Sequence, residues 1–321
     1  MFWKSWAVWV IVCSASFLSA QEPTGELAQR LATLEVTHYA EAPGYSEGPT
    51  WRNGEVFFCS GGLLRVEKDR KVSKYLDLNP AGTFLRENGD ILICDNKYHA
   101  ILNLAADGTV GVVAEKAGDQ PLNSLNDLTA DAKGSIYWTD PAGSSADKPI
   151  GNIYRVNSAG QVDKIATGLA FPNGLDVDPS SQNLFVVESQ TQKILKYPLP
   201  EETKPLGTPT TFFELGGAGG DGCAFDAEGN LWVADFHRKE TGKGRITVVS
   251  SAGKVLAHLN IPSKVVSNIT FGGADNDEIF CTTGEPPGVF HAKVRVKGFR
   301  GHPVREARIQ RKLEIRAAQQ H

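Results

Sequence analysis

Short apolar runs that end in a small or polar residue recur along the chain. Each holds four residues before that last position, and most of them favour strands. Six such runs are present, at residues 56–60, 91–95, 136–140, 184–188, 231–235 and 279–283. Their last residues lie 35, 45, 48, 47 and 48 positions apart. A near-constant spacing of this size indicates a structural repeat.

Turn-forming pairs such as Asn53-Gly54 and Asn88-Gly89 precede the runs, and another short apolar segment lies before each turn. Two further strand-like segments follow most of the runs. The unit is therefore four antiparallel strands in about 45 residues, which is typical of a propeller blade. The sequence predicts an all-β, six-bladed β-propeller over residues 33–298.

The two ends of the repeat region carry extra segments. Residues 34–39 alternate in polarity and belong to no blade of their own, so we expect them to form the outer strand of the last blade and close the ring. Residues 21–32 are predicted to be a linker or a short helix. In the tail, 299–321, Ile309, Leu313 and Ala317 recur at helical spacing and predict a short basic helix.

The first twenty residues have the pattern of a cleaved signal peptide. Lys4 precedes an apolar run over residues 6–18, and Ser19-Ala20 supplies small residues before the expected cleavage. The run is short for a membrane span, although an uncleaved anchor is the alternative. We therefore expect an exported protein, periplasmic or extracellular, without a stable membrane span.

Charge is distributed unevenly along the chain. Residues 21–292 hold 23 Lys and Arg against 35 Asp and Glu, whereas residues 293–321 hold nine against two. An acidic body disfavours nucleic acid and favours a cation. The basic tail is either solvated or loosely docked, or it binds an acidic partner or an anionic surface. Cys59, Cys94, Cys223 and Cys281 lie inside apolar runs, which favours buried thiols, with one disulfide as the alternative. The oligomeric state is left open.

The first strand of each blade lines the central channel, so equivalent positions converge on the axis. Alignment of the repeats gives Glu47, Ala81, Asn126, Asn173, Asp221 and Ser267. Carboxylate and amide oxygens suit a hard cation, and Glu47, Asn173 and Asp221 supply three. The alternative is that Asn-Gly and Asp-Gly pairs are present only as turns.

The chain resembles the senescence marker protein, gluconolactonase and luciferin-regenerating enzyme family. The segments that carry the resemblance are 47–51, 122–128, 136–141, 171–175, 220–222 and 271–273. Their order and spacing together are specific. Ser124 stands where animal members of the family place an arginine.

The resemblance implies a six-bladed propeller with one divalent metal on its axis, and an enzyme that opens sugar lactones. It implies metal ligation by Glu47, Asn173 and Asp221, and it places Asn126 near the metal, in contact with substrate or water. Asp127 follows the same motif as a supporting substrate residue. Calcium is favoured, with zinc, magnesium or manganese as alternatives.

Lactone hydrolysis needs a base and a group that stabilises the developing oxyanion. We expect Asp221 to assist the attacking water and Asn126 to donate a hydrogen bond to the oxyanion. His99 and His237 are substrate-contact candidates in loops at the funnel mouth, and surface or packing roles are the alternative.

Residues 44–48 match G-x-S-x-G but lack the following helix that a serine nucleophile needs. Two other functions stay open: a related esterase or phosphotriesterase, and a non-catalytic exported propeller that binds a ligand or partner protein.

Overall fold

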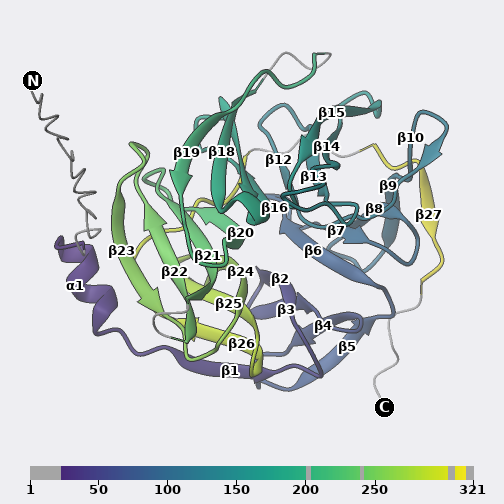
Figure 1. The fold of residues 1–321 in the computed structure, drawn as a ribbon. Coiled ribbons are helices and arrows are strands. Elements are labelled where there is room, and N and C mark those ends of the chain that lie inside the picture. Colours follow the sequence, from purple (N-terminus) through teal and green to yellow (C-terminus); the bar gives the residue numbers. More distant parts are fainter. Residues whose placement is uncertain (1–22, 200–203, 239–241, 303–307, 316–321) are drawn as a thin grey trace, which may run out of the picture.

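The computed structural model describes residues 23–199, 204–238, 242–302 and 308–315. Within them, six antiparallel sheets of four or five strands are arranged around a central axis, as Figure 1 shows. The predicted six-bladed β-propeller is confirmed. The predicted signal peptide and Ala317 of the predicted tail helix lie outside the described residues. No described helix is long and apolar enough to cross a membrane.

Each blade runs from an inner strand at the channel to an outer strand at the rim. The first blade contains β2 (Glu47–Arg52), β3 (Glu55–Cys59), β4 (Leu63–Val66) and β5 (Val72–Leu76). The second contains β6 (Pro80–Leu85), β7 (Ile91–Asp95), β8 (Ala100–Leu104) and β9 (Val110–Ala114). The third contains β12 (Leu128–Ala130), β13 (Ile136–Asp140), β14 (Gly151–Val156) and β15 (Val162–Leu169). A small hairpin of β10 (Lys116–Ala117) and β11 (Gln120–Pro121) joins the second blade to the third.

The last three blades repeat this order. The fourth blade contains β16 (Pro172–Val177), β17 (Asn183–Glu188), β18 (Lys193–Pro198) and β19 (Thr210–Glu214). The fifth contains β20 (Gly220–Phe225), β21 (Leu231–Arg238), β22 (Lys243–Val249) and β23 (Val255–Asn260). The sixth contains β24 (Val266–Gly272), β25 (Glu278–Gly284) and β26 (Pro287–Ala292). A 3-10 turn, η1 (Ser189–Thr191), follows β17.

The sixth blade is completed by the N-terminal strand β1 (Thr37–Glu41). It pairs antiparallel with β26, so the first strand of the chain is the outer strand of the last blade, as predicted. The expected short helix is α1 (Glu26–Ala32), and its Leu31 is buried in the cluster that holds Leu259 of β23. Ring closure therefore joins both ends of the propeller region (Figure 1).

The predicted C-terminal helix is wrong over residues 308–315. There the chain forms β27 (Arg311–Leu313), which adds a fifth strand to the second blade by pairing with β9. The open backbone edge of β9 offers hydrogen bonds that an isolated short helix lacks. Ile309 packs over Gly111, where a Cβ would lie 2.7 Å from the Ile309 Cγ2 atom. Two basic residues of this segment bind the propeller itself, because Arg311 pairs with Glu115 at 2.7 Å and Arg308 donates to the Ala159 carbonyl at 2.9 Å.

Hydroxyl side chains connect neighbouring inner strands across the blade boundaries. Thr83 donates to the carbonyl of Gly48, Thr139 to that of Asn173, and Ser267 to that of Ser46, at 2.6, 2.8 and 2.6 Å. Buried apolar clusters fill the space between blades, and Trp138 and Trp232 are fully buried in them. The four described cysteines are buried and free, as expected. The inner strands are thus held at fixed positions around the channel.

Candidate metal and substrate site in the channel

A cavity of about 330 Å³ opens at one end of the channel. Glu47, Asn126, Asn173 and Asp221 all line it, so the structure brings together four of the six residues that repeat alignment selected. Asn173 and Asp221 are buried, whereas Glu47 and Asn126 are half-buried. They come from four different blades, and their convergence follows from the symmetry of the repeat.

A local irregularity in the inner strands aims these side chains at the axis. The pairing register shifts between Glu47 and Thr50 in β2, between Pro172 and Leu175 in β16, and between Gly220 and Cys223 in β20. A bulge of this kind bends a strand and redirects a side chain out of the regular alternation. Asn173 and Asp221 lie inside the shifted segments.

The glycine after each motif residue serves close packing between blades. A Cβ on Gly174 would lie 2.4 Å from the Asp221 carbonyl oxygen, and one on Gly222 would lie 1.9 Å from Asn268 Oδ1. Neither glycine has a positive φ. The Asn-Gly and Asp-Gly pairs are therefore sites of close approach around the channel, and the turn explanation does not apply to them.

The two carboxylates of the cavity lie close together. The Tyr45 hydroxyl donates to Asp221 Oδ2 at 3.1 Å and lies 3.5 Å from Glu47 Oε1. Burial raises the pKa of Glu47 well above its usual range, and the negative charges of Asp221 and Asp127 raise it further. Burial also raises the pKa of Asp221 to about 7, and the Asp127 charge adds to the effect. None of the described residues that line the cavity is Lys, Arg or His, so no side chain there neutralises the pair.

These features fit a bound cation. Two convergent carboxylate groups and the Asn173 amide form an oxygen-rich donor set, which suits a hard divalent ion. Among the described residues, no group of three His, Cys, Asp or Glu is arranged to hold a metal. The candidate site therefore depends on the Asn173 amide as its third protein ligand.

Asn268 is a channel residue that repeat alignment missed. Its amide donates to Glu47 Oε2 and to Asp127 Oδ2, both at 3.1 Å. Ser267 was selected instead, but its hydroxyl is buried against the Ser46 carbonyl. The register shift in β24 lies between Val266 and Asn268, so the axial position of this blade is displaced by one residue. A residue count through a regular strand does not reveal such a shift.

Other residues that surround the cavity also lie outside the repeat alignment. Tyr45, Phe171 and Phe236 supply aromatic side chains, and the Asn173 amide donates to Ser189 Oγ at 3.3 Å. Phe171 has φ +58°, an unusual backbone state for a bulky residue, and its N–H donates to Ser144 Oγ at 2.8 Å. Strained residues of this kind gather at functional sites. A positive φ at Phe171 has no sequence signal that we recognise.

The remaining predicted site residues lie elsewhere. His99 is exposed and is not among the described residues that line the cavity. His237 belongs to β21, and its side chain lies outside the described part of the structure. Asp127 is buried beneath the candidate site, where it accepts hydrogen bonds from the backbone of Leu128 and from Asn268.

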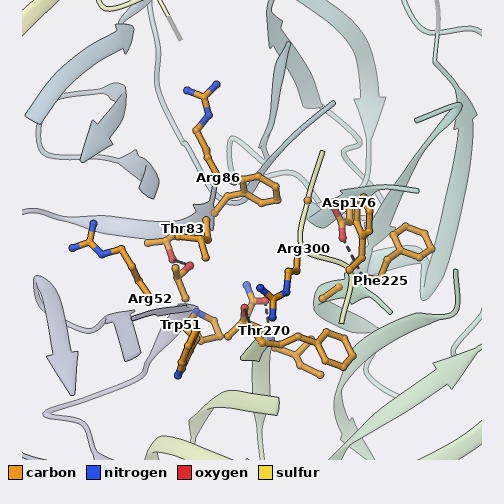
Figure 2. A pocket seen from close by; sticks show the side chains of 18 of the residues that line it. Trp51, Arg52, Thr83, Arg86, Asp176, Phe225, Thr270 and Arg300 are labelled. Atoms are coloured by element: carbon orange, nitrogen blue, oxygen red, sulfur yellow. Dashed lines mark hydrogen bonds between the residues drawn. The ribbon is translucent and has the colours of Figure 1, made fainter. Parts of the chain in front are cut away.

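The opposite end of the channel holds a second cavity of about 370 Å³. Figure 2 shows Arg300 reaching towards its centre, with Trp51, Asp176 and Thr270 around it. Asp127 and Asp176 belong to this second cavity, where each carboxylate accepts backbone hydrogen bonds. The second cavity is the larger of the two, but basic side chains such as Arg300 line it. The first cavity holds the converging carboxylates of Glu47 and Asp221 without a basic side chain in its described lining, so it is the better candidate for the functional site.

Comparison of the sequence with known proteins finds one matching family and relatives that span most of the chain. Residues 45–285 match the family described as the SMP-30/Gluconolactonase/LRE-like region. The chain is 28% identical over 248 residues to the 6-deoxy-6-sulfogluconolactonase of Pseudomonas putida, and the match covers 74% of this chain and 82% of that protein.

Two solved structures extend the comparison. A gluconolactonase from Xanthomonas campestris aligns with a TM-score of 0.72 at 25% identity, over 85% of this chain and 94% of that one. The calcium-binding protein regucalcin from Agrobacterium tumefaciens aligns with a TM-score of 0.70 at 21% identity, over 85% and 98%. At 21% identity, the similarity to regucalcin shows a shared fold only.

Proposed function

Because this chain belongs to the SMP-30/gluconolactonase/LRE-like family, we propose that it is a divalent-metal-dependent hydrolase that opens sugar lactones. The observation that carries the proposal is the convergence of Glu47, Asn173 and Asp221 on one cavity whose described lining has no basic side chain. Relatives named as lactonases support the reaction class. The regucalcin likeness supports the fold, and the oxygen donors favour calcium over softer metals.

In this proposal Glu47, Asn173 and Asp221 would hold the ion. A bound divalent cation would polarise the lactone carbonyl as a Lewis acid. Asp221 accepts a proton from the attacking water, whose oxygen bonds to the carbonyl carbon. Asn126 donates a hydrogen bond to the oxygen that becomes negative. When the ring C–O bond breaks, Asp221 returns the proton to the leaving oxygen, and a hydroxy acid is released.

The signal peptide expected at residues 1–20 would place this activity in the periplasm or the extracellular medium. The substrate is then a small lactone that reaches that compartment. Asp127 supports the site through Asn268, because its carboxylate and that of Glu47 share one amide donor.

The first test is acid release from glucono-1,5-lactone, followed by pH-stat on the purified protein. We expect EDTA to abolish the activity, calcium or zinc to restore it, and Asp221→Ala to lower kcat/KM by about 100-fold or more. Asp147→Ala, at an exposed loop residue, is the control and should behave as wild type. Tight calcium binding without turnover of any lactone would favour a binding protein, and turnover of esters alone would favour an esterase.

A further inference from the structure

Tyr45 reaches the two candidate carboxylate ligands from outside the repeat. It directly precedes Ser46 and β2, and its hydroxyl lies 3.1 Å from Asp221 Oδ2 and 3.5 Å from Glu47 Oε1. Asp221 lies 176 residues away in the sequence. A hydroxyl carries a single proton, so it donates to one carboxylate at a time, and the shorter distance favours Asp221.

The adjacent residue Ser46 and the contact of the ring with Gly284 fix this tyrosine. Ser46 Oγ lies 2.9 Å from the carbonyl oxygen of Thr283 and 2.8 Å from that of Gly288, which anchors the residue next to Tyr45. The ring rests on Gly284, where a Cβ would lie 2.9 Å from Tyr45 Cδ2. The glycine thus leaves room for the ring, and the ring in turn directs the hydroxyl inwards.

The ring forms part of the cavity wall. Tyr45 is 50% exposed, although its hydroxyl bonds a buried carboxylate. Phe171 and Phe236 line the same cavity. Aromatic faces pack against the C–H groups of ring-shaped ligands and add apolar contact area at a small entropic cost. The side chain therefore offers a polar tip to the ligand carboxylates and an apolar face to the cavity.

We propose, on the premise of the lactonase function, that Tyr45 has two separable roles. Its hydroxyl is a positioning group that orients Asp221 relative to Glu47 before the cation and the water engage that carboxylate. Its ring contacts the lactone and contributes to substrate affinity. A neighbour that orients a ligand side chain in this way commonly influences metal affinity and turnover together.

Two substitutions separate the roles. Tyr45→Phe keeps the ring and removes only the hydroxyl, so we expect kcat to fall by about tenfold, KM to stay within about twofold, and calcium affinity measured by titration calorimetry to fall by about threefold or more. Tyr45→Leu also removes the flat ring, so KM should rise by about fivefold or more over that of Tyr45→Phe. Tyr75→Phe, on the outer strand β5, is the matched control and should equal wild type.

Each role has a result that overturns it. Wild-type kcat and calcium affinity in Tyr45→Phe would reject the positioning role, and equal KM values for the Phe and Leu variants would reject the ring contact. The calorimetric titration separates this inference from the lactonase proposal. If wild type binds calcium but turns over no lactone, the reaction and the ring contact fail, while the affinity of Tyr45→Phe still decides the positioning role. If wild type binds no divalent cation, that role is rejected as well.

Discussion

Asn268 shows how one side chain couples the two ends of the channel. Its amide donates to Glu47 in the first cavity and to Asp127 in the second, and its own oxygen accepts the Ile269 N–H at 2.8 Å. The hydrogen-bonding capacity of the amide is therefore largely used. Asn268 also opens an Asn-Ile-Thr sequon, but its side chain is buried in this arrangement, so we expect no glycan there.

We expect Asn268→Ala to weaken both stability and cation binding. It leaves buried Asp127 and half-buried Glu47 without their shared donor, which costs about 1–3 kcal/mol, and it releases Glu47 from its orientation. Asn103→Ala is the matched control, because Asn103 is also buried and donates to Asp90 at 3.0 Å on β8, away from the channel. Urea unfolding and calcium titration check both variants. Loss of calcium affinity in Asn103→Ala, or its retention in Asn268→Ala, would contradict the assignment.

The sequence identifies the candidate ligand residues in the cavity more readily than the residues around them. Glu47, Asn173 and Asp221 share one phase of the repeat, so counting along the blades identifies them. Asn268 is displaced by a bulge, and Tyr45 reaches the site only through the three-dimensional arrangement of distant strands. Residues defined by symmetry are visible in one sequence, whereas those defined by a register shift or a long-range contact are not.

Strand β27 shows how an element can differ from its own local pattern. Ile309 and Leu313 fit a helical spacing, but Leu313 and Ile315 also alternate as in a strand and pack against the apolar cluster of the second blade. The free edge of β9 decides between the two patterns, and this edge is a property of the folded blade. The propeller strands were predictable because each contains its own strand and turn signals.

The contact between Gly111 and Ile309 tests whether the tail stabilises the propeller. Gly111 has extended backbone, so alanine fits there locally, but its Cβ would lie 2.7 Å from Ile309. We expect Gly111→Ala to cost about 1 kcal/mol in the wild-type chain and close to nothing in an Ile309→Ala background. A double-mutant cycle of urea midpoints measures the coupling. Equal costs in both backgrounds would show that β27 is docked too loosely to matter.

At the scale of the whole molecule, the channel concentrates buried acid. Burial raises the pKa of Asp127 to about 7 and that of Asp176 to about 6, from an ordinary value of 3.8. Asp176 accepts hydrogen bonds from Thr129, Val177 and Phe225 but has no basic partner among these contacts. Between about pH 4 and pH 6 the folded state therefore retains protons that the unfolded chain has already released.

This arrangement predicts that the protein loses stability as the pH rises. A raised folded-state pKa makes the folded form bind more protons than the unfolded form, so the free energy of unfolding falls from about pH 4 to pH 7 and then levels off. In EDTA, Asp176→Asn should reduce that fall by up to about 3 kcal/mol, whereas Asp147→Asn should leave it unchanged. Unfolding free energies from urea melts at each pH measure this. A steeper slope in Asp176→Asn would reject the explanation.

The pairing of β1 with β26 also sets an order of events during synthesis. The Thr37 hydroxyl donates to the carbonyl of His291, 254 residues later. Strand β1 is synthesised before all the others, but its partner β26 belongs to the last blade. The ring of blades can therefore close only when nearly the whole chain has left the ribosome. Until then β1 has no partner strand, and its backbone edge is open to proteases and to other chains. We therefore expect ring closure to be a late step in the folding of this protein, after its other blades have been made.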